Sequence, residues 1–229
     1  MFNQIICIAA LLSFAGIVNS LDKVKNDNIE GTYAVKKGLH YSNKTTVTWG
    51  MNSQKSWYTI ASLSLAAATY NSSETCDDPA WYYDWNKLWG KARCGYFHGH
   101  HQDSDRFVFR RCSDPTCASY IPGTQRIEIA TYSYDNGIKP YEYPQPNPTV
   151  LQPFAITIEP YVPYKFSIDL DEKGASIFSL STIDGKLLET HTVLHTITCT
   201  DNYFEGVVDG LYFGGDCRAP EDLVVTYSL

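Results

Sequence analysis

The sequence predicts an all-β protein: a β-sandwich or jelly roll of two antiparallel sheets, with a short helical or loop segment near the N-terminal third. Polar and apolar residues alternate at period two through much of the second half, which is typical of half-buried strands. Turn sequences that contain Gly or Asp separate these segments, as they do between antiparallel strands. The chain also contains 17 Tyr, 5 Trp and 10 Phe, and aromatic residues favour strands.

The N-terminus is predicted to be a signal peptide that is cleaved after Ser20. Ile5–Val18 is an apolar run without a charged residue, and it is shorter than the about 20 residues that a membrane-spanning helix needs. The basic residues that usually precede such a run are missing, which leaves an uncleaved anchor as the alternative. No later segment is long and apolar enough to cross a membrane. We therefore expect a secreted, extracellular protein in which residues 21–229 form one jelly-roll domain.

Six cysteines follow the signal peptide, and their even number predicts disulfides. They are Cys76, Cys94, Cys112, Cys117, Cys199 and Cys217. Proximity in the sequence favours Cys76 with Cys94, Cys112 with Cys117 and Cys199 with Cys217, although fifteen pairings are open. The sequence contains no C-x-x-C pair of the kind that binds zinc. The sequons at Asn43 and Asn71 predict N-glycosylation, in agreement with secretion.

The first part of the mature chain gives mixed signals. Asn43–Trp49 is rich in Thr and Val and predicts a strand, whereas Lys55–Ala68 is compatible with a strand or a helix. Trp81, Trp85 and Trp89 recur at a spacing of four, which predicts a short helix with one Trp face. Alternatively, these indoles pack inward from a disulfide-tied loop, or they form an exposed platform for sugar.

The second part of the chain gives clearer strand patterns. In Arg106–Arg111, Phe107 and Phe109 share one face, and Arg106 and Arg110 share the other. Pro140–Pro153 is predicted to be a Pro-rich loop that crosses one end of a sheet. The further predicted strands are Arg126–Tyr132, Tyr164–Leu170, Ser176–Ser181, Lys186–His195, Gly206–Phe213 and Leu223–Tyr227.

Several segments in this part resemble the closing strands of concanavalin A-like jelly rolls. They are Tyr164–Leu170, the Asp184-Gly185 hairpin, Gly210–Gly215 and Ala219–Tyr227. That superfamily includes lectins, laminin-G-like modules, glucanases and alginate-lyase-like polysaccharide lyases, and the resemblance implies a carbohydrate bound across the concave sheet. The Gln-Ile-His and Tyr-Phe-Lys-x-Gly signatures of the alginate-lyase-like enzymes are not found, so the chemistry has to be inferred from side chains.

The densest group of reactive side chains lies in residues 98–106 and continues on the polar face of the following strands. If these strands are neighbours, arginines, histidines and tyrosines line one groove. Arginine binds carboxylates, and β-elimination of a uronate needs a neutralised carboxylate, a base and an acid. The candidate bases are His98, His100 and His101, and the candidate acids are Tyr132 and Tyr134. The candidate substrate-binding residues are Arg106, Arg110, Arg126, Glu128 and Gln102.

The sequence therefore predicts a carbohydrate-active protein that binds an acidic polysaccharide and cleaves it by β-elimination. A net charge of -7 argues against nucleic acid or an anionic membrane as partner, and a monomer is expected. A non-catalytic lectin or a cell-wall-binding or host-interaction protein is the alternative. A glycoside hydrolase is a further one, with Glu128 and a second carboxyl from Asp103, Asp105 or Glu205.

Other side chains also have alternative interpretations. Arg106 and Glu128 could form a cross-strand ion pair. His98 and His100 could bind a metal with Asp103 or Asp105, but we expect no cofactor, with a structural calcium ion as the alternative. His191 and His195 are interpreted as surface or hydrogen-bonded positions on one strand face.

Overall fold

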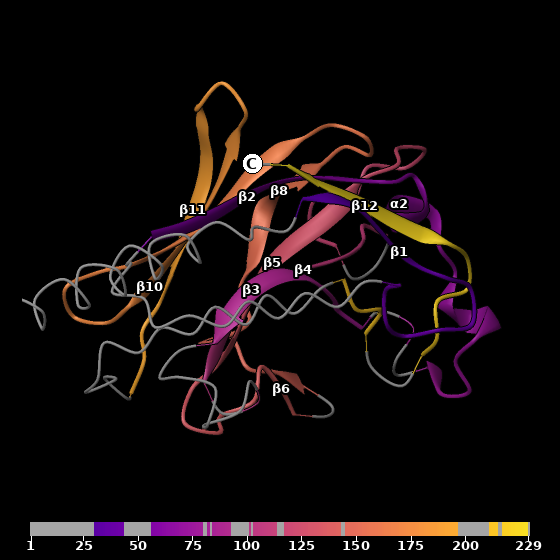
Figure 1. Cartoon of the computed structure of the whole chain (residues 1–229). Helices are drawn as coiled ribbons and strands as arrows, with labels where there is room; N and C mark the ends of the chain where they lie inside the picture. Colours follow the sequence, from indigo (N-terminus) through magenta and orange to yellow (C-terminus); the bar gives the residue numbers. More distant parts are fainter. Residues whose placement is uncertain are drawn as a thin grey trace, which may run out of the picture.

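Two antiparallel sheets pack face to face and enclose the main core (Figure 1). The computed structural model describes residues 30–43, 56–79, 82, 84–92, 101, 103–113, 117–142, 145–196, 211–214 and 217–228. In this part of the chain the only helical segments are the short α2 (Ala66–Thr69) and η2 (Ser72–Glu74). The predicted β-sandwich, with a short helical segment near its N-terminal third, is confirmed.

The larger sheet has the strand order β1-β12-β2-β9-β10-β11, and the smaller one has the order β3-β4-β5-β8. The strands of the larger sheet are β1 (Gly31–Val35), β12 (Leu223–Ser228), β2 (Ser56–Leu63), β9 (Tyr164–Leu170), β10 (Ser176–Thr182) and β11 (Leu187–Val193). Those of the smaller sheet are β3 (Asn86–Ala92), β4 (Ser104–Arg111), β5 (Ile127–Tyr134) and β8 (Pro153–Ile158). A separate hairpin consists of β6 (Tyr141–Glu142) and β7 (Gln145–Pro146).

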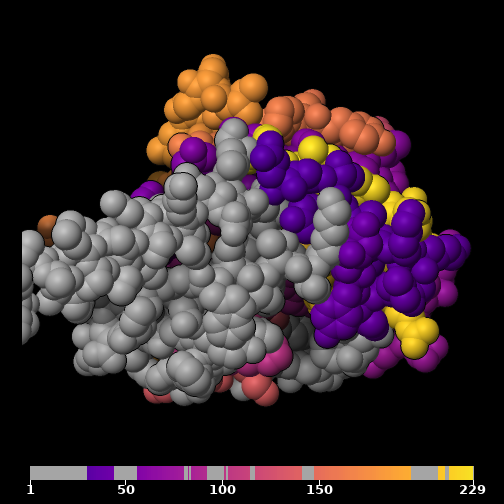
Figure 2. All heavy atoms as spheres, in the orientation of Figure 1, coloured from indigo at the N-terminus to yellow at the C-terminus, as the bar shows by residue number. Residues whose placement is uncertain are grey.

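The two ends of the described chain meet in the larger sheet. Strand β1 pairs with β12 antiparallel, from Gly31 opposite Tyr227 to Val35 opposite Leu223. Figure 2 shows the indigo N-terminal residues beside the yellow C-terminal ones on the same face of the molecule. The sandwich is thus closed by a pairing between segments that are far apart in the sequence.

Phenylalanines from both sheets meet in the main core. The Phe107 ring of β4 lies 5.2 Å from that of Phe166 in β9 and 5.1 Å from that of Phe178 in β10, and all three residues are fully buried. Edge-to-face contacts of this kind stabilise a core beyond the burial of area. Because alternate residues of a strand point to opposite faces, the even-numbered residues of β4 point away from this core, as predicted.

The segment with three tryptophans is not a helix. Trp89 belongs to β3 and packs in the main core, whereas Trp85 lies just before β3 in a second cluster. Their four-residue spacing resembles a helical repeat, but a register shift between Lys87 and Trp89 lets one extended segment place the two indoles on opposite faces. The predicted Trp-bearing helix is therefore wrong for these two residues, and Trp81 lies outside the described residues.

Several other sequence predictions are refined by the structure. Residues 55–68 contain both alternatives, since β2 is followed by α2. Residues 140–153 include the β6–β7 hairpin and end at the first residue of β8, a strand that the sequence did not predict, and β1 was not predicted either. Residues 44–49 and 206–210 lie outside the described residues, so the predicted strands there stay predictions.

The disulfides only partly follow proximity in the sequence. Cys112 pairs with Cys117 as predicted. Cys76 pairs with Cys217, 141 residues away, so the pairings of Cys76 with Cys94 and of Cys199 with Cys217 are wrong. Folding brings the segment after η2 beside the approach to β12, with 4.7 Å between the two Cα atoms, and short sequence distance cannot anticipate this. Cys94 and Cys199 lie outside the described residues.

The remaining predictions about secretion are tested only in part. No helix in the described ranges is long and apolar enough to cross a membrane. Asn43 and Asn71 are both exposed, and their side-chain oxygens accept backbone hydrogen bonds from Ala34 and Ser73 respectively. These bonds do not use the amide nitrogen that a glycan would modify. Glycosylation and the signal peptide stay predictions.

Candidate functional site

The polar residues predicted on two strands do come together on one face of the smaller sheet. Strands β4 and β5 pair antiparallel, with Arg106 opposite Tyr132 and Arg110 opposite Glu128. These side chains point away from the main core, on the face that also holds a second apolar cluster. That cluster comprises Trp85, Val108, Ala130, Tyr132 and Leu151. We call this the outer face and call Lys87, Arg106, Tyr132 and Tyr134 the outer-face site.

Lys87 also lies on the outer face, although it was not predicted from the sequence as a site residue. It pairs with Val108 across β3 and β4, which places its side chain on the outer face. Its ammonium group donates to the carbonyl oxygen of Trp85 at 2.9 Å and lies 4.7 Å from the ring centre of Tyr132. Burial lowers the pKa of Lys87 to about 8; Asp84 opposes this shift and Arg106 adds to it.

Tyr132 and Tyr134 both face outward from β5. Their ring centres are 5.8 Å apart at an interplanar angle of 68°. Burial raises the pKa of the Tyr132 hydroxyl above its ordinary value, and Tyr134 and Asp84 act in the same direction. Tyr132 therefore keeps its proton across the neutral and mildly alkaline range and can donate it to a departing oxygen.

Arg106 is held in the centre of the outer face. It is only 6% exposed and lies between Gly90 of β3 and Tyr132 of β5. A Cβ atom on Gly90 would lie 2.1 Å from the backbone oxygen of Asp105 and 2.5 Å from Cα of Arg106, so only glycine lets the β4 backbone approach β3 this closely. Gly90 thus allows the close pairing of β3 with β4 at Arg106.

Arg110 and Glu128 share the outer face but bind each other. Arg110 Nε donates to Glu128 Oε2 at 2.5 Å, and the guanidinium group lies 4.2 Å from the Trp85 ring. Burial raises the pKa of Glu128, and the adjacent Arg110 opposes the shift. The cross-strand ion pair of this face therefore joins Glu128 to Arg110 and not to Arg106. Both residues lie on the outer face, beside the outer-face site.

The other candidate residues are placed differently. Arg126 precedes β5, at the end opposite to Tyr134, and its Nη1 donates to Glu159 at 2.7 Å. His101 is exposed, and its ring centre lies 5.3 Å from that of Tyr134, at the margin of the outer-face site. His98, His100 and Gln102 lie outside the described residues.

The two carboxyl groups of a glycosidase are not found around Glu128 in the part of the chain described here. Asp105 alternates with Arg106 on β4 and therefore points to the inner side of the sheet, away from Glu128. Asp103 is fully buried and accepts the backbone N–H of Asn136 at 3.2 Å. The predicted pairs of Glu128 with Asp103 or Asp105 are therefore wrong, and Glu205 lies outside the described residues.

A second polar group lies between the sheets, on the inner side of β4. We call Lys91, Asp105, Asp135, Ser176 and His195 the inner cluster. Asp105 accepts hydrogen bonds from Ser133 at 2.8 Å and from Ser176 at 2.6 Å, and Lys91 Nζ lies 3.7 Å from the same carboxylate.

His195 completes the inner cluster. Its Nε2 is 3.0 Å from Ser176 Oγ and 3.3 Å from Asp105 Oδ1, and its Nδ1 is 3.7 Å from Asp135 Oδ1. This resembles a Ser-His-Asp arrangement, but the Ser176 proton is donated to Asp105, and Ser176 is fully buried. A substrate therefore has no access to the serine, and we interpret the cluster as structural.

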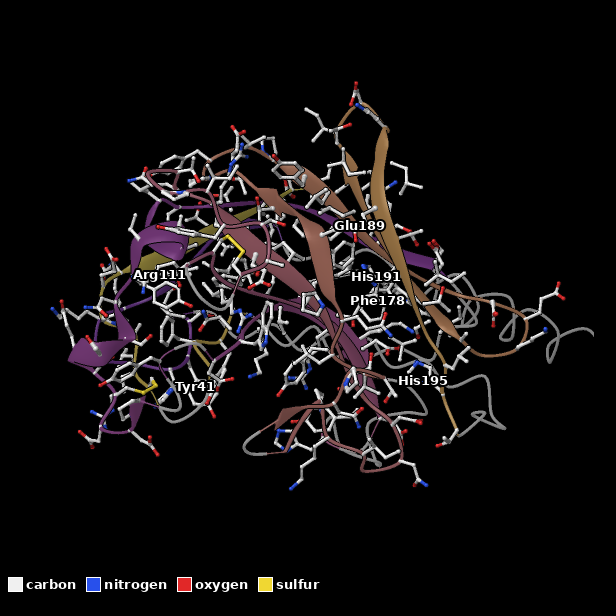
Figure 3. All side chains as sticks on the ribbon, turned by 180° about the vertical axis from the view of Figure 1, so that it is seen from behind. Tyr41, Arg111, Phe178, Glu189, His191 and His195 are labelled. Carbon is white, nitrogen blue, oxygen red and sulfur yellow. A yellow bond between two sulfur atoms is a disulfide. The ribbon has the colours of Figure 1, made fainter. Side chains whose placement is uncertain are left out.

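The two histidines nearest the C-terminus, His191 and His195, have different surroundings. His191 is half-buried, with Nε2 2.8 Å from Glu189 and Nδ1 3.2 Å from Gln152, whereas His195 is buried in the inner cluster. Figure 3 shows His191 beside Glu189 and His195 further along the same segment. Both have hydrogen-bonding partners, as expected, but β11 ends at Val193, so the predicted placement of both histidines on one strand face is wrong. Within the described ranges, no group of three or more His, Cys, Asp or Glu side chains is arranged to hold a metal ion.

The solved structures named below are distant matches to this chain. No family model matches the chain, and no curated protein matches it. Among solved structures, the alginate lyase from Klebsiella pneumoniae is 13% identical, with a TM-score of 0.39 over 75% of this chain and 56% of that one. Alginate lyase AlyC3 is 10% identical, with a TM-score of 0.45 over 86% and 72%. The chain thus spans little more than half of the Klebsiella enzyme, and these matches assign neither a family nor an activity.

Proposed function

We propose that the protein binds an acidic, uronate-containing polysaccharide on its outer face and cleaves it by β-elimination. The observation that best supports this is the pairing of Lys87, whose pKa is lowered to about 8, with Tyr132, whose pKa is raised. The two groups lie 4.7 Å apart, measured from the ammonium group to the ring centre, beside Arg106. Oppositely shifted neighbours of this kind suit a base and an acid that act on one substrate.

Arg106 is the residue proposed to bind the uronate carboxylate. A guanidinium group forms two parallel hydrogen bonds to a carboxylate, and their strength grows where water is excluded. Neutralising the carboxylate makes the proton on the adjacent C5 more acidic and stabilises the negative charge that develops when that proton leaves. The surroundings of Arg106, which is 6% exposed, favour this effect.

Lys87 is the proposed base and Tyr132 the proposed acid. At pH 8 about half of the Lys87 side chains are neutral and can accept the C5 proton. The electrons of the C5–H bond form the C4–C5 double bond, the bond from C4 to the glycosidic oxygen breaks, and Tyr132 gives its proton to that oxygen. The products are an unsaturated uronate and a new sugar end, and no oxidant or further reactant is needed.

The distribution of charge also supports an acidic substrate. The chain as a whole has a net charge of -7 and would repel polyanions at most of its surface. The outer-face site nevertheless combines Lys87 and Arg106 with two tyrosines. The Cys76–Cys217 disulfide agrees with an oxidising environment such as the space outside cells. Acidic polysaccharides occur in that space.

The test is to incubate the purified protein with a panel of uronate-containing and neutral polysaccharides. Absorbance of unsaturated uronates and reducing ends are followed in parallel. A rise in both with one acidic polymer, lost in Lys87→Met and Tyr132→Phe, is the expected result. Lys165→Met is the matched control, because Lys165 also lies over a tyrosine, at 4.3 Å from the Tyr58 ring, but on the larger sheet. Reducing ends without new absorbance would replace elimination by hydrolysis.

A glycan-binding protein without catalysis is the second candidate. It is favoured by the aromatic side chains beside Lys87, since Tyr41 and Tyr212 have ring centres 5.0 Å apart and Tyr41 is 66% exposed. Retention of the protein on an acidic polymer without any cleavage would support this function in place of the lyase.

A further inference from the structure

An exposed tyrosine pair extends the outer face beyond β3. Tyr41 bridges to Tyr212, and Tyr212 bridges in turn to Lys87 of β3. Residues paired across antiparallel bridges point to the same face. Tyr41, Tyr212 and Lys87 therefore form one row across the strands, on the face of the outer-face site.

The geometry of this row fixes how far Tyr41 lies from the proposed base. Neighbouring strands are about 4.8 Å apart, so Tyr41 lies roughly 10 Å, or two strand spacings, from Lys87. The Lys87 ammonium group is 5.6 Å from the Tyr212 ring centre, which places Tyr212 between the two. A distance of this size corresponds to about the length of a disaccharide.

The Tyr41 ring is both exposed and held in place. It meets the Tyr212 ring at an interplanar angle of 67°. The His40 ring stacks on the Tyr212 ring, with 5.8 Å between the ring centres and an interplanar angle of 17°. The His40 and Phe213 backbones are joined by a hydrogen bond of 2.8 Å. A ring that is fixed before binding loses little freedom when a ligand packs on it.

We propose that Tyr41 and Tyr212 form a sugar-stacking subsite for the same acidic polymer, two sugar units from the residue that reacts. This proposal rests on the proposed function. A pyranose ring presents C–H groups on one face, and an aromatic ring packs against such a face while its hydroxyl group stays in water. The polymer then runs across the strands, along the row from Tyr41 to Lys87, and the protein acts within long chains in preference to short oligomers.

Other exposed tyrosines lack this relation to the site and therefore serve as controls. Tyr161 is 69% exposed, but it belongs to the turn after β8. Tyr58 is 48% exposed, but it lies on the larger sheet against Lys165. Neither residue is joined to β3 by a bridge, so neither should affect binding to the outer face.

The experiment compares Tyr41→Ala with Tyr58→Ala and Tyr161→Ala, by affinity electrophoresis in gels that contain the acidic polymer. Kinetics on size-defined oligomers are measured in parallel. Tyr41→Ala is expected to weaken retention and to raise KM for long chains by roughly five- to tenfold, as for one lost aromatic contact. We expect kcat to stay unchanged, the shortest substrates to be unaffected, Tyr41→Trp to restore binding and both controls to match the wild type.

The outcomes separate this proposal from the lyase proposal. Full retention and an unchanged KM in Tyr41→Ala would overturn the subsite and leave elimination standing. Retention of the wild type without cleavage, weakened in Tyr41→Ala, would overturn the lyase and support the subsite. Neither retention nor cleavage with any acidic polymer would overturn both.

Discussion

Strand β4 has charged residues on both faces, and the two faces use them differently. On the inner side, Asp105 accepts two serine hydroxyl groups and lies within 4 Å of both Lys91 and His195. On the outer side, Arg106 lies next to Lys87 and Tyr132, and the Lys87 ammonium group lies over the rings of Tyr132 and Tyr212. One position along the strand therefore separates a balanced ionic cluster from a cationic aromatic surface.

The difference lies in the partners of the buried charges. Buried ions are tolerated when opposite charges and hydrogen bonds compensate them, and the inner cluster has both. Lys87 forms no ion pair among the described residues, and its pKa falls because burial disfavours the charged form. If buried polar groups were the only criterion, the inner cluster would be the candidate site. The outer face is the better candidate because the charge of Lys87 is not compensated by an ion pair among the described residues.

The largest expected effect is on catalysis. Lys87→Met and Tyr132→Phe each remove a proton-transfer group and should lower kcat by about 10²–10⁴-fold. Each change should lower the free energy of unfolding by only about 1 kcal/mol, because Lys87→Met loses the hydrogen bond to the Trp85 carbonyl and Tyr132→Phe loses a hydroxyl group but retains an aromatic ring. Initial rates of uronate unsaturation and urea unfolding curves are the two measurements. A folded Lys87→Met with wild-type activity would assign the base to another group, such as His101.

The second effect is on stability and is confined to the inner side. Asp105→Ala leaves Lys91 and His195 without their shared carboxylate and should lower the free energy of unfolding by about 3–5 kcal/mol, the usual cost of breaking a buried ion pair. Urea titration measures this loss. Asp105→Asn, which keeps an oxygen acceptor for the serines, should lose less. Equal stability of Asp105→Ala and the wild type would contradict the compensating role of the inner cluster.

The third effect is the pH dependence of the outer face. Because the base acts when neutral, kcat/KM should rise with pH and level off above about 8, and Lys87→Met should abolish this rise. The pKa of Lys87 is lower in the folded protein than its ordinary value of 10.5, so between about pH 8 and 10.5 the unfolded chain binds more protons. The stability of the wild type relative to Lys87→Met should therefore rise across that window, which pH-dependent urea unfolding can check.

The sequence predicted the parts of this arrangement that depend on local alternation. The period-two pattern on β4 and β5 assigned Phe107 to the core and Arg106 to the opposite face, and the observed register then placed Arg106 beside Tyr132. Lys87 was missed because the spacing of four between Trp85 and Trp89 resembles a helix, and only the register shift in β3 shows that it is not.

Contacts between distant segments could not be predicted in this way. The Cys76–Cys217 disulfide and the link between His195 and Asp105 each join segments that only the closed sandwich brings together. Likewise, the row from Tyr41 to Lys87 depends on Tyr212, a residue bridged to both but remote from them in the sequence. Alternation shows which face a residue occupies, whereas the neighbours on that face follow from topology.

The smallest effect is expected at Arg126, which the sequence grouped with Arg106 as a substrate-binding residue. Arg126 pairs with Glu159 at the surface, with 32% of its side chain exposed, so Arg126→Ala should change the free energy of unfolding by at most about 1 kcal/mol. Its kcat/KM on the acidic polymer should stay within about twofold of the wild type, whereas Arg106→Ala should lose about 10²–10³-fold. If Arg126→Ala were as inactive as Arg106→Ala, the polymer would run along β5 toward Glu159. The path across the strands to Tyr41 would then be wrong, so this comparison also determines the direction of the bound chain.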